Sequence, residues 1–208
     1  MNHGAAAGIF SALLSASLQI APPPLAGQTP VPNEERIESG QGQSPAGQGI
    51  AYRIRLLPIA SFPALPASIS AELARRQCMI PQSFEAQQPE NVIHGSFRAP
   101  GSSDWAALCS SQGSTTLLVF LAGQPEPIAL RTQPDSAWLG AEPGSANFGS
   151  SWGIAVLSAD ELRASPGLRR NAPIDHDAIE DARLERSLSV RYYSGGRWLD
   201  LNYENGTH

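Results

Sequence analysis

The chain contains no lysine, and all 14 of its basic side chains are arginine. This excludes chemistry that needs a lysine amine: Schiff-base formation, pyridoxal-phosphate attachment, and the lysines of phosphate-binding loops and kinases. Histidine is almost as scarce, because two of the four lie at the chain ends and only His94 and His176 are internal. A three-histidine zinc site cannot be built from two internal imidazoles.

Charge is also sparse, since Asp, Glu, Lys and Arg make up 16% of the 208 residues and the net charge is −5. The densest basic runs are the pairs Arg75-Arg76 and Arg169-Arg170. Without a basic patch we expect neither nucleic acid nor anionic lipid as a partner. The 18 prolines and 19 glycines favour turns over long helices, and 41% apolar residues suffice for a core.

The N-terminal residues 5–21 form an apolar run that is short for a membrane span and rich in alanine and serine. Three prolines follow, and Leu25-Ala26-Gly27 then offers small residues for a signal peptidase. We interpret residues 1–27 as a signal peptide, although no Lys or Arg precedes the apolar run. The predicted location is secreted or periplasmic, and an uncleaved segment would tether the domain to a membrane.

Residues 28–49 are mainly Gln, Gly, Pro and Ser around an acidic patch that includes Glu34 and Glu35. They show no hydrophobic periodicity, so we predict a flexible linker. A single mainly β domain is expected over residues 50–205, which agrees with the usual size of about 100–200 residues per domain.

The most informative stretch is residues 104–122, DWAALCSSQGSTTLLVFLA, which has the pattern of a β-hairpin. With Gln112-Gly113 as its turn, Trp105 lies opposite Phe120. Both faces of this hairpin are apolar. Because a hairpin without a polar face must be covered on both sides, we expect the rest of the domain to pack around it.

The two cysteines, Cys78 and Cys109, link this hairpin to an earlier helix. The helix is expected over residues 69–79, with Ser68 as its N-cap and Pro81 as its stop. In an exported protein we expect a Cys78–Cys109 disulfide that clips the helix against the hairpin. The loop of about 30 residues that it closes corresponds to roughly 3–4 kcal/mol of stabilisation.

The remaining elements are short. Residues 165–182 are predicted to be mostly loop, and a last hairpin over residues 184–203 turns at Gly195-Gly196. We predict an antiparallel, mainly β fold of the sandwich, barrel or blade-like kind, with one short N-terminal helix and the disulfide. The other expected strands begin near residue 50 and at residues 91–97, 128–131, 137–139 and 152–157, with a further helical turn at 159–163.

The segment 91–108, NVIHGSFRAPGSSDWAAL, resembles the FG-GAP or VCBS-type repeat of secreted proteins and integrin propellers. Gly95-Ser96-Phe97 and Asp104-Trp105-Ala106 keep the frame of that repeat. The resemblance implies an extracytoplasmic β domain with a calcium loop. The loop itself departs from the pattern, because residues 98–101 are Arg, Ala, Pro and Gly where Asp and Asn would ligate calcium.

The densest group of ligand-type side chains is Asp175, Asp177 and Glu180, with His176 between the two aspartates. Two interpretations stay open: a solvated acidic loop with no cofactor, or a site for calcium or magnesium. His176 could also act as a base beside a carboxylate. An extracytoplasmic hydrolase, with or without the assistance of a metal ion, would use His176 with Asp177 and His94.

A Gly-x-Ser-x-Gly pattern surrounds Ser151 and is found in serine hydrolases. It runs into the apolar sequence IAVL, which is typical of a strand, whereas the hydrolase motif needs a strand, a sharp turn and a helix. We therefore interpret it as a Gly/Ser turn that enters a strand.

The last hairpin supplies the predicted binding residues. Its turn places Tyr193 opposite Trp198 and Arg191 opposite Asp200, on the face that we expect to lie outside the core. Such a face could stack on a sugar ring or anchor a protein. The favoured function is a secreted or periplasmic, non-catalytic binding module for a protein or carbohydrate at the cell envelope.

Overall fold

The computed structural model of the chain describes residue 1 and residues 33–43, 47, 49–141, 147–166, 168, 173–184 and 187–201. Every helix and strand among them belongs to the second of two units, Val31–His208. The expected signal peptide, residues 1–27, lies outside the described residues except for Met1.

The predicted central hairpin is confirmed and lies in the middle of a four-stranded antiparallel sheet of order β4-β5-β6-β7. Trp105 pairs with Phe120, as the turn position predicted. Gln112 and Gly113 have φ angles of 53° and 77°, the positive values that a tight two-residue turn needs. The strands are β4 (Val92–Gly95), β5 (Asp104–Ser111), β6 (Ser114–Phe120) and β7 (Ile128–Pro134).

A second antiparallel sheet has the order β10-β11-β12-β13 and contains the last hairpin in the predicted register. The loop prediction for residues 165–182 is wrong at its end, because β11 begins at Ala178. Its sequence, AIEDAR, lacks the apolar pattern of a strand because two carboxylates lie in its middle. The strands are β10 (Trp152–Leu157), β11 (Ala178–Arg183), β12 (Ser187–Ser194) and β13 (Arg197–Leu201).

A third sheet, of order β1-β2-β9-β8 with β3 beside β2, is antiparallel except where β2 meets β9. Its first strand corrects the linker prediction for residues 28–49, because β1 pairs with β2 over its whole length. A Cβ atom at Gly40 would lie 2.5 Å from the Tyr52 hydroxyl, so this glycine lets the ring cover the strand. The strands are β1 (Arg36–Gln43), β2 (Gly49–Leu57), β3 (Ile80–Pro81), β8 (Leu139–Ala141) and β9 (Phe148–Ser150).

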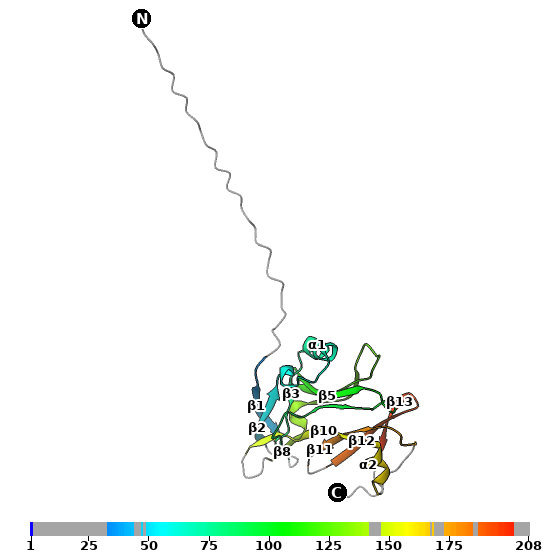
Figure 1. Cartoon of the computed structure of the whole chain (residues 1–208). Helices are drawn as coiled ribbons and strands as arrows, with labels where there is room; N and C mark the ends of the chain where they lie inside the picture. The colour runs from blue at the N-terminus through cyan, green and yellow to red at the C-terminus, as the bar shows by residue number, and fades with distance from the viewer. Residues whose placement is uncertain are drawn as a thin grey trace. The chain divides into compact units, whose positions relative to one another are not determined.

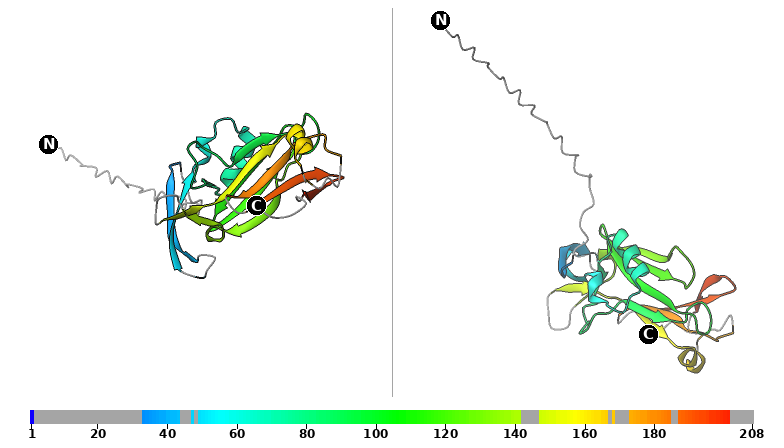
Figure 2. Two further views of the ribbon diagram at one scale, coloured as in Figure 1. Left: turned by 90° about the horizontal axis from the view of Figure 1, so that it is seen from below. Right: turned by 45° about the horizontal axis from the view of Figure 1, so that its top comes forward.

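The hairpin is covered on both faces, as expected. One face packs against the β10–β13 sheet, and the opposite face packs against helix α1 (Ala67–Arg75). Helix α2 (Ala159–Ala164) in turn contributes Leu162 to the core on the outer side of the β10–β13 sheet. Figure 1 shows the resulting order of helix, sheet, sheet and helix, and the left view of Figure 2 shows β1 and β2 extending beyond it.

Most of the interior between the two sheets is one apolar cluster. Leu108, Leu117 and Val119 come from the hairpin, whereas Ile179 comes from β11, and all four are 0% exposed or nearly so. Of the predicted sandwich, barrel and blade-like folds, the chain thus adopts a sandwich of mainly antiparallel sheets. The other buried residues of this cluster are Phe97, Ala106, Leu121, Trp152 and Ile154.

Helix α1 begins and ends earlier than predicted. Its N-cap is Pro66 instead of Ser68, and no side chain caps it. Its end is set by Gln77, whose φ of 58° is left-handed, and not by Pro81. The amide of Cys78 then donates to the carbonyl of Leu73 at 3.0 Å, a typical closing bond of a helix end. Neither described α-helix is long and apolar enough to cross a membrane.

Two short 3₁₀ segments, η1 (Ile59–Ser61) and η2 (Asp135–Ala137), complete the described elements. Segment η2 stabilises the turn end of the β5–β6 hairpin. Its buried Asp135 carboxylate accepts hydrogen bonds from the hydroxyl groups of Ser110 at 2.8 Å and Thr115 at 2.5 Å.

The Cys78–Cys109 disulfide is confirmed. It joins the residue just beyond α1 to β5, across 31 positions of sequence and a Cα–Cα distance of 4.9 Å. Both cysteines are buried, so the bridge lies inside the core between the helix and the hairpin.

Removing this bridge with the double substitution Cys78→Ser and Cys109→Ser is expected to lower the free energy of unfolding by about 3–4 kcal/mol, because the unfolded chain regains the entropy of a 31-residue loop. Denaturant titration measures the loss, and reduction of the wild-type protein should reproduce it. A loss below about 1 kcal/mol in both experiments would contradict a stabilising role of the disulfide.

Candidate functional site

Helix α1 is too short to cover the sheet beneath it. Its nine residues span about 14 Å, whereas the seven or eight residues of β5 and β6 span about 25 Å. The helix covers the middle of the hairpin, where Ala107 and Leu118 meet Leu73 in one cluster. Trp105 and Phe120, at the open end of the hairpin, also pack against this cluster but stay half-exposed.

This partly covered end forms a groove of about 300 Å³, which we call the aromatic groove. Its floor is the cross-strand pair Trp105 and Phe120, both half-buried. The His94 ring packs on Trp105 with 4.6 Å between the ring centroids, and its Nε2 lies 2.9 Å from the Ser103 hydroxyl. The remaining lining residues are Pro66, Ser68, Ile69 and Glu72 from the helix side and residues 121–125 after β6.

Glu72 is the ionisable residue that lines the aromatic groove, and its charge is neutralised. Hydrogen bonds from Arg75 and Arg76 lower the pKa of the Glu72 carboxyl to about 2. The two guanidinium groups approach one carboxylate oxygen at 2.7 and 2.6 Å. The groove thus presents aromatic rings, hydroxyl groups and the Gln124 amide without an unpaired charge.

Sequence reasoning missed the aromatic groove, although it placed Trp105 opposite Phe120. The expectation that both faces of the hairpin are covered did not indicate that the rings at its open end stay half-exposed. The signal that could have located the groove is the difference in length between the expected helix and the two strands.

The loop between β4 and β5 is held by the carboxylate of Asp104. Asp104 is fully buried, and its oxygens accept hydrogen bonds from the Arg98 amide at 2.8 Å, the Ser102 hydroxyl at 2.5 Å and the Ala122 amide at 2.7 Å. This one side chain ties the loop to the end of β6 and so shapes the groove.

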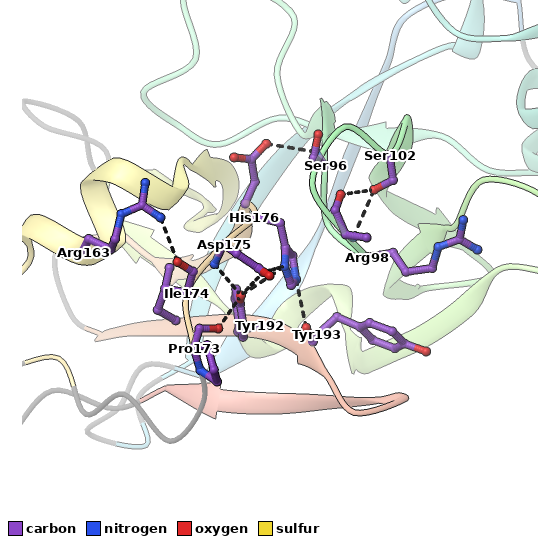
Figure 3. A network of polar contacts seen from close by, with 12 residues as sticks. Ser96, Arg98, Ser102, Arg163, Pro173, Ile174, Asp175, His176, Tyr192 and Tyr193 are labelled. Carbon is purple, nitrogen blue, oxygen red and sulfur yellow. Dashed lines mark hydrogen bonds and ion pairs between the residues drawn. The ribbon is translucent and has the colours of Figure 1, made fainter.

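His176 is buried beside the last hairpin, in the polar network of Figure 3. Its Nδ1 lies 2.6 Å from an Asp175 oxygen and its Nε2 lies 2.9 Å from the Tyr193 carbonyl oxygen. Its ring stacks on Tyr192 at 4.3 Å. The hydrogen bond from His176, followed by one from Tyr192, lowers the pKa of Asp175. Both ring nitrogens are therefore engaged in holding the loop to β12.

The three predicted metal ligands have different surroundings. Asp177 accepts a hydrogen bond from the Ser96 amide at 2.9 Å, whereas Asp175 binds His176 and Tyr192. Glu180 lies in β11, where burial and the nearby Glu161 raise its pKa. Within the described ranges, no group of three or more His, Cys, Asp or Glu side chains is arranged to hold a metal ion.

The residues of the hydrolase alternative are likewise bound to other groups. His94 pairs with Ser103 and Trp105, whereas both nitrogens of His176 have the partners given above. The Ser151 hydroxyl donates to the Trp138 carbonyl at 3.0 Å in a residue that is 1% exposed. Ser151 therefore belongs to the turn that enters β10, as we interpreted it.

The face of the last hairpin that we expected outside the core is packed. Tyr193 and Trp198 are half-buried against the cluster between the sheets, and their rings meet edge to face at 5.4 Å. The expectation failed because β11, which the sequence analysis did not identify, completes this sheet, and the sheet then meets the β4–β7 sheet. Arg191 and Asp200 bind each other.

Arg191 also belongs to a buried polar network around Asp181. The Asp181 carboxylate is 1% exposed as a residue and contacts Arg191 at 3.0 Å, Arg131 at 3.4 Å and the Trp152 indole nitrogen at 2.9 Å. Arg131 comes from β7 and Arg191 from β12, so this one carboxylate connects the two sheets.

Comparisons with known proteins add no family to this picture: no protein-family model, curated protein or solved structure matches the chain. The resemblance of residues 91–108 to an FG-GAP or VCBS-type repeat stays a prediction.

Replacing Asp181 by asparagine is expected to lower the free energy of unfolding by about 3–5 kcal/mol, because Arg131 and Arg191 lose a buried counter-charge. Asp200→Asn is the matched control, since it removes an exposed partner of the same Arg191 and should cost less than about 1 kcal/mol. Denaturant titration compares the two variants, and equal losses would contradict a cross-link between the sheets through Asp181.

Glu180→Gln is expected to stabilise the protein at pH 7, because the raised pKa of Glu180 means that the ionised carboxylate is disfavoured in the folded state. The benefit should vanish as the pH falls through the raised pKa toward pH 4, where the wild-type side chain is neutral in the folded protein. Thermal unfolding from pH 7 to 4 measures this. Glu85→Gln, on an exposed side chain, is the control; a benefit that is independent of pH would contradict the assignment.

Proposed function

We propose that this chain is an extracytoplasmic, non-catalytic binding module that takes a neutral sugar ring in the aromatic groove. The observation that carries the proposal is the Trp105–Phe120 pair, which helix α1 covers only in part and which lines the groove. The site therefore differs from the Tyr193 and Trp198 face that the sequence suggested.

The chemistry of the groove favours a sugar. A pyranose ring has an apolar face and a rim of hydroxyl groups, which match an aromatic floor with polar groups at its edges. Ser68, Ser103 and Gln124 are exposed at the rim and can exchange hydrogen bonds with such hydroxyls. Because Glu72 is neutralised by two arginines, a neutral ligand meets no unpaired charge.

Two features support the extracytoplasmic location. The buried Cys78–Cys109 disulfide is of the kind that persists in oxidising compartments. Residues 1–27 have the pattern of a signal peptide.

We propose a non-catalytic role because the side chains that could act in acid–base chemistry are held in hydrogen bonds with other groups of the protein. The carboxylate in the groove has a pKa of about 2, far below the range of a general acid or base near neutral pH. His176 and Ser151 are committed to backbone carbonyl groups.

An array of neutral oligosaccharides probed with the full-length protein tests the proposal. Trp105→Ala should weaken binding of the recognised glycan at least about tenfold, because a central aromatic contact is removed. Gln124→Ala, at an exposed rim position, should weaken it less without affecting the fold.

Leu188→Ala is the matched control, since Leu188 is an exposed apolar side chain that does not line the groove. It should leave glycan binding unchanged. Absence of any bound neutral glycan, or equal effects of Trp105→Ala and Leu188→Ala, would refute the proposal, and a protein ligand bound at Trp105 would replace the sugar.

A further inference from the structure

Arg98 differs from the other arginines of the described segments. Most of these form hydrogen bonds or ion pairs with a carboxylate or a backbone carbonyl. Arg53, Arg98 and Arg197 have no side-chain partner among the described residues, but Arg53 and Arg197 are exposed whereas Arg98 is half-buried. A half-buried guanidinium without an acceptor loses solvation and gains no hydrogen bond in return.

Arg98 lines a cavity of about 300 Å³ between the β4–β5 loop and the β12–β13 turn. Tyr193 lines the same cavity, and Figure 3 shows its phenol and the Arg98 side chain extending to the same side, away from His176. The Tyr193 hydroxyl has no hydrogen-bond partner in the described part of the chain. Two donors from separate segments thus border one space.

The turn opposite Arg98 adds backbone donors. Gly195 and Gly196 line the cavity, both are exposed and both have positive φ, at 59° and 81°. Without side chains, they let a ligand approach the backbone closely.

The charges around the cavity favour a singly charged anion. Arg98 supplies one unpaired positive charge, and its guanidinium fork matches the two oxygens of a carboxylate. The Asp175 carboxylate lies on another wall, bonded to His176 and Tyr192. A doubly charged phosphate would meet repulsion from Asp175 with only one free cation to offset it.

We propose that this cavity is a binding site for a ligand carboxylate, which Arg98 holds with its guanidinium and Tyr193 with its hydroxyl. The site is separate from the aromatic groove and does not depend on the function proposed for it. An acidic sugar and an acidic amino acid carry the same recognised group.

Titration of the ¹⁵N-labelled full-length protein at pH 7 with galacturonate and with N-acetylaspartate tests the site. At least one of them should shift the Arg98 Nε–Hε signal and the amides of Gly195 and Gly196, and which one does so identifies the source of the carboxylate. Galactose, the neutral counterpart of galacturonate, should leave these signals in place.

Arg98→Gln should weaken carboxylate binding at least about tenfold, because charge-assisted hydrogen bonds are lost. The substitution should not unfold the protein, since the Arg98 side chain makes no bond within the described structure. Tyr193→Phe should weaken binding by a smaller factor.

Arg197→Gln is the matched control. It also removes one positive charge, next to the Gly195-Gly196 turn, but Arg197 does not line the cavity, so binding should be unchanged. Equal weakening by Arg98→Gln and Arg197→Gln would show attraction by overall charge only and would overturn the proposal. So would inorganic phosphate binding more tightly than both carboxylates, or no shift with either carboxylate up to about 10 mM.

Discussion

The structure depends on one constraint, the hairpin of β5 and β6 whose two faces are both apolar. Burial of apolar surface on both sides requires two separate coverings, and the chain supplies the β10–β13 sheet on one face and α1 on the other. The disulfide fixes the helical cover, and buried aspartates hold the hairpin at both ends. Asp135 binds near the turn and Asp104 binds at the open end.

The same constraint explains where the two candidate sites lie. A nine-residue helix covers the Trp105–Phe120 end of the hairpin only in part, so both rings stay half-exposed. The Asp104 carboxylate shapes the loop that separates this end from the cavity at Arg98. Both candidate sites therefore border one short loop whose conformation is set by a single buried carboxylate.

Local patterns were enough to predict the two hairpins, their registers and the disulfide. Tight turns such as Gln112-Gly113 set the register by themselves, and two cysteines allow a single pairing. The predictions failed where a distant partner decides the structure. β11 contains Glu180 and Asp181 and lacks strand-like alternation, but Arg131 and Arg191 compensate the buried Asp181. β1 is rich in Gly and Gln, and its strand depends on pairing with β2.

The candidate site could not be predicted for the same reason. The sequence placed Tyr193 and Trp198 on a free face because their own sheet, which contains the missed strand β11, packs this face against the β4–β7 sheet. The partial exposure of Trp105 gave no signal, because no local pattern shows how far α1 reaches along the hairpin. Nothing in the sequence indicated Arg98, because the cavity that it lines and its lack of a described partner are properties of the folded chain.

Native-state hydrogen exchange tests the central role of the hairpin most directly. If both faces are covered as described, the slowest-exchanging amides should lie in residues 106–109 and 117–119 and should exchange only on global unfolding. Reduction of the disulfide should lower the free energy of exchange of these amides by the same amount as that of global unfolding, about 3–4 kcal/mol. Slowest exchange in the β1–β2 pair or the β12–β13 hairpin, with the central hairpin opening first, would contradict the account.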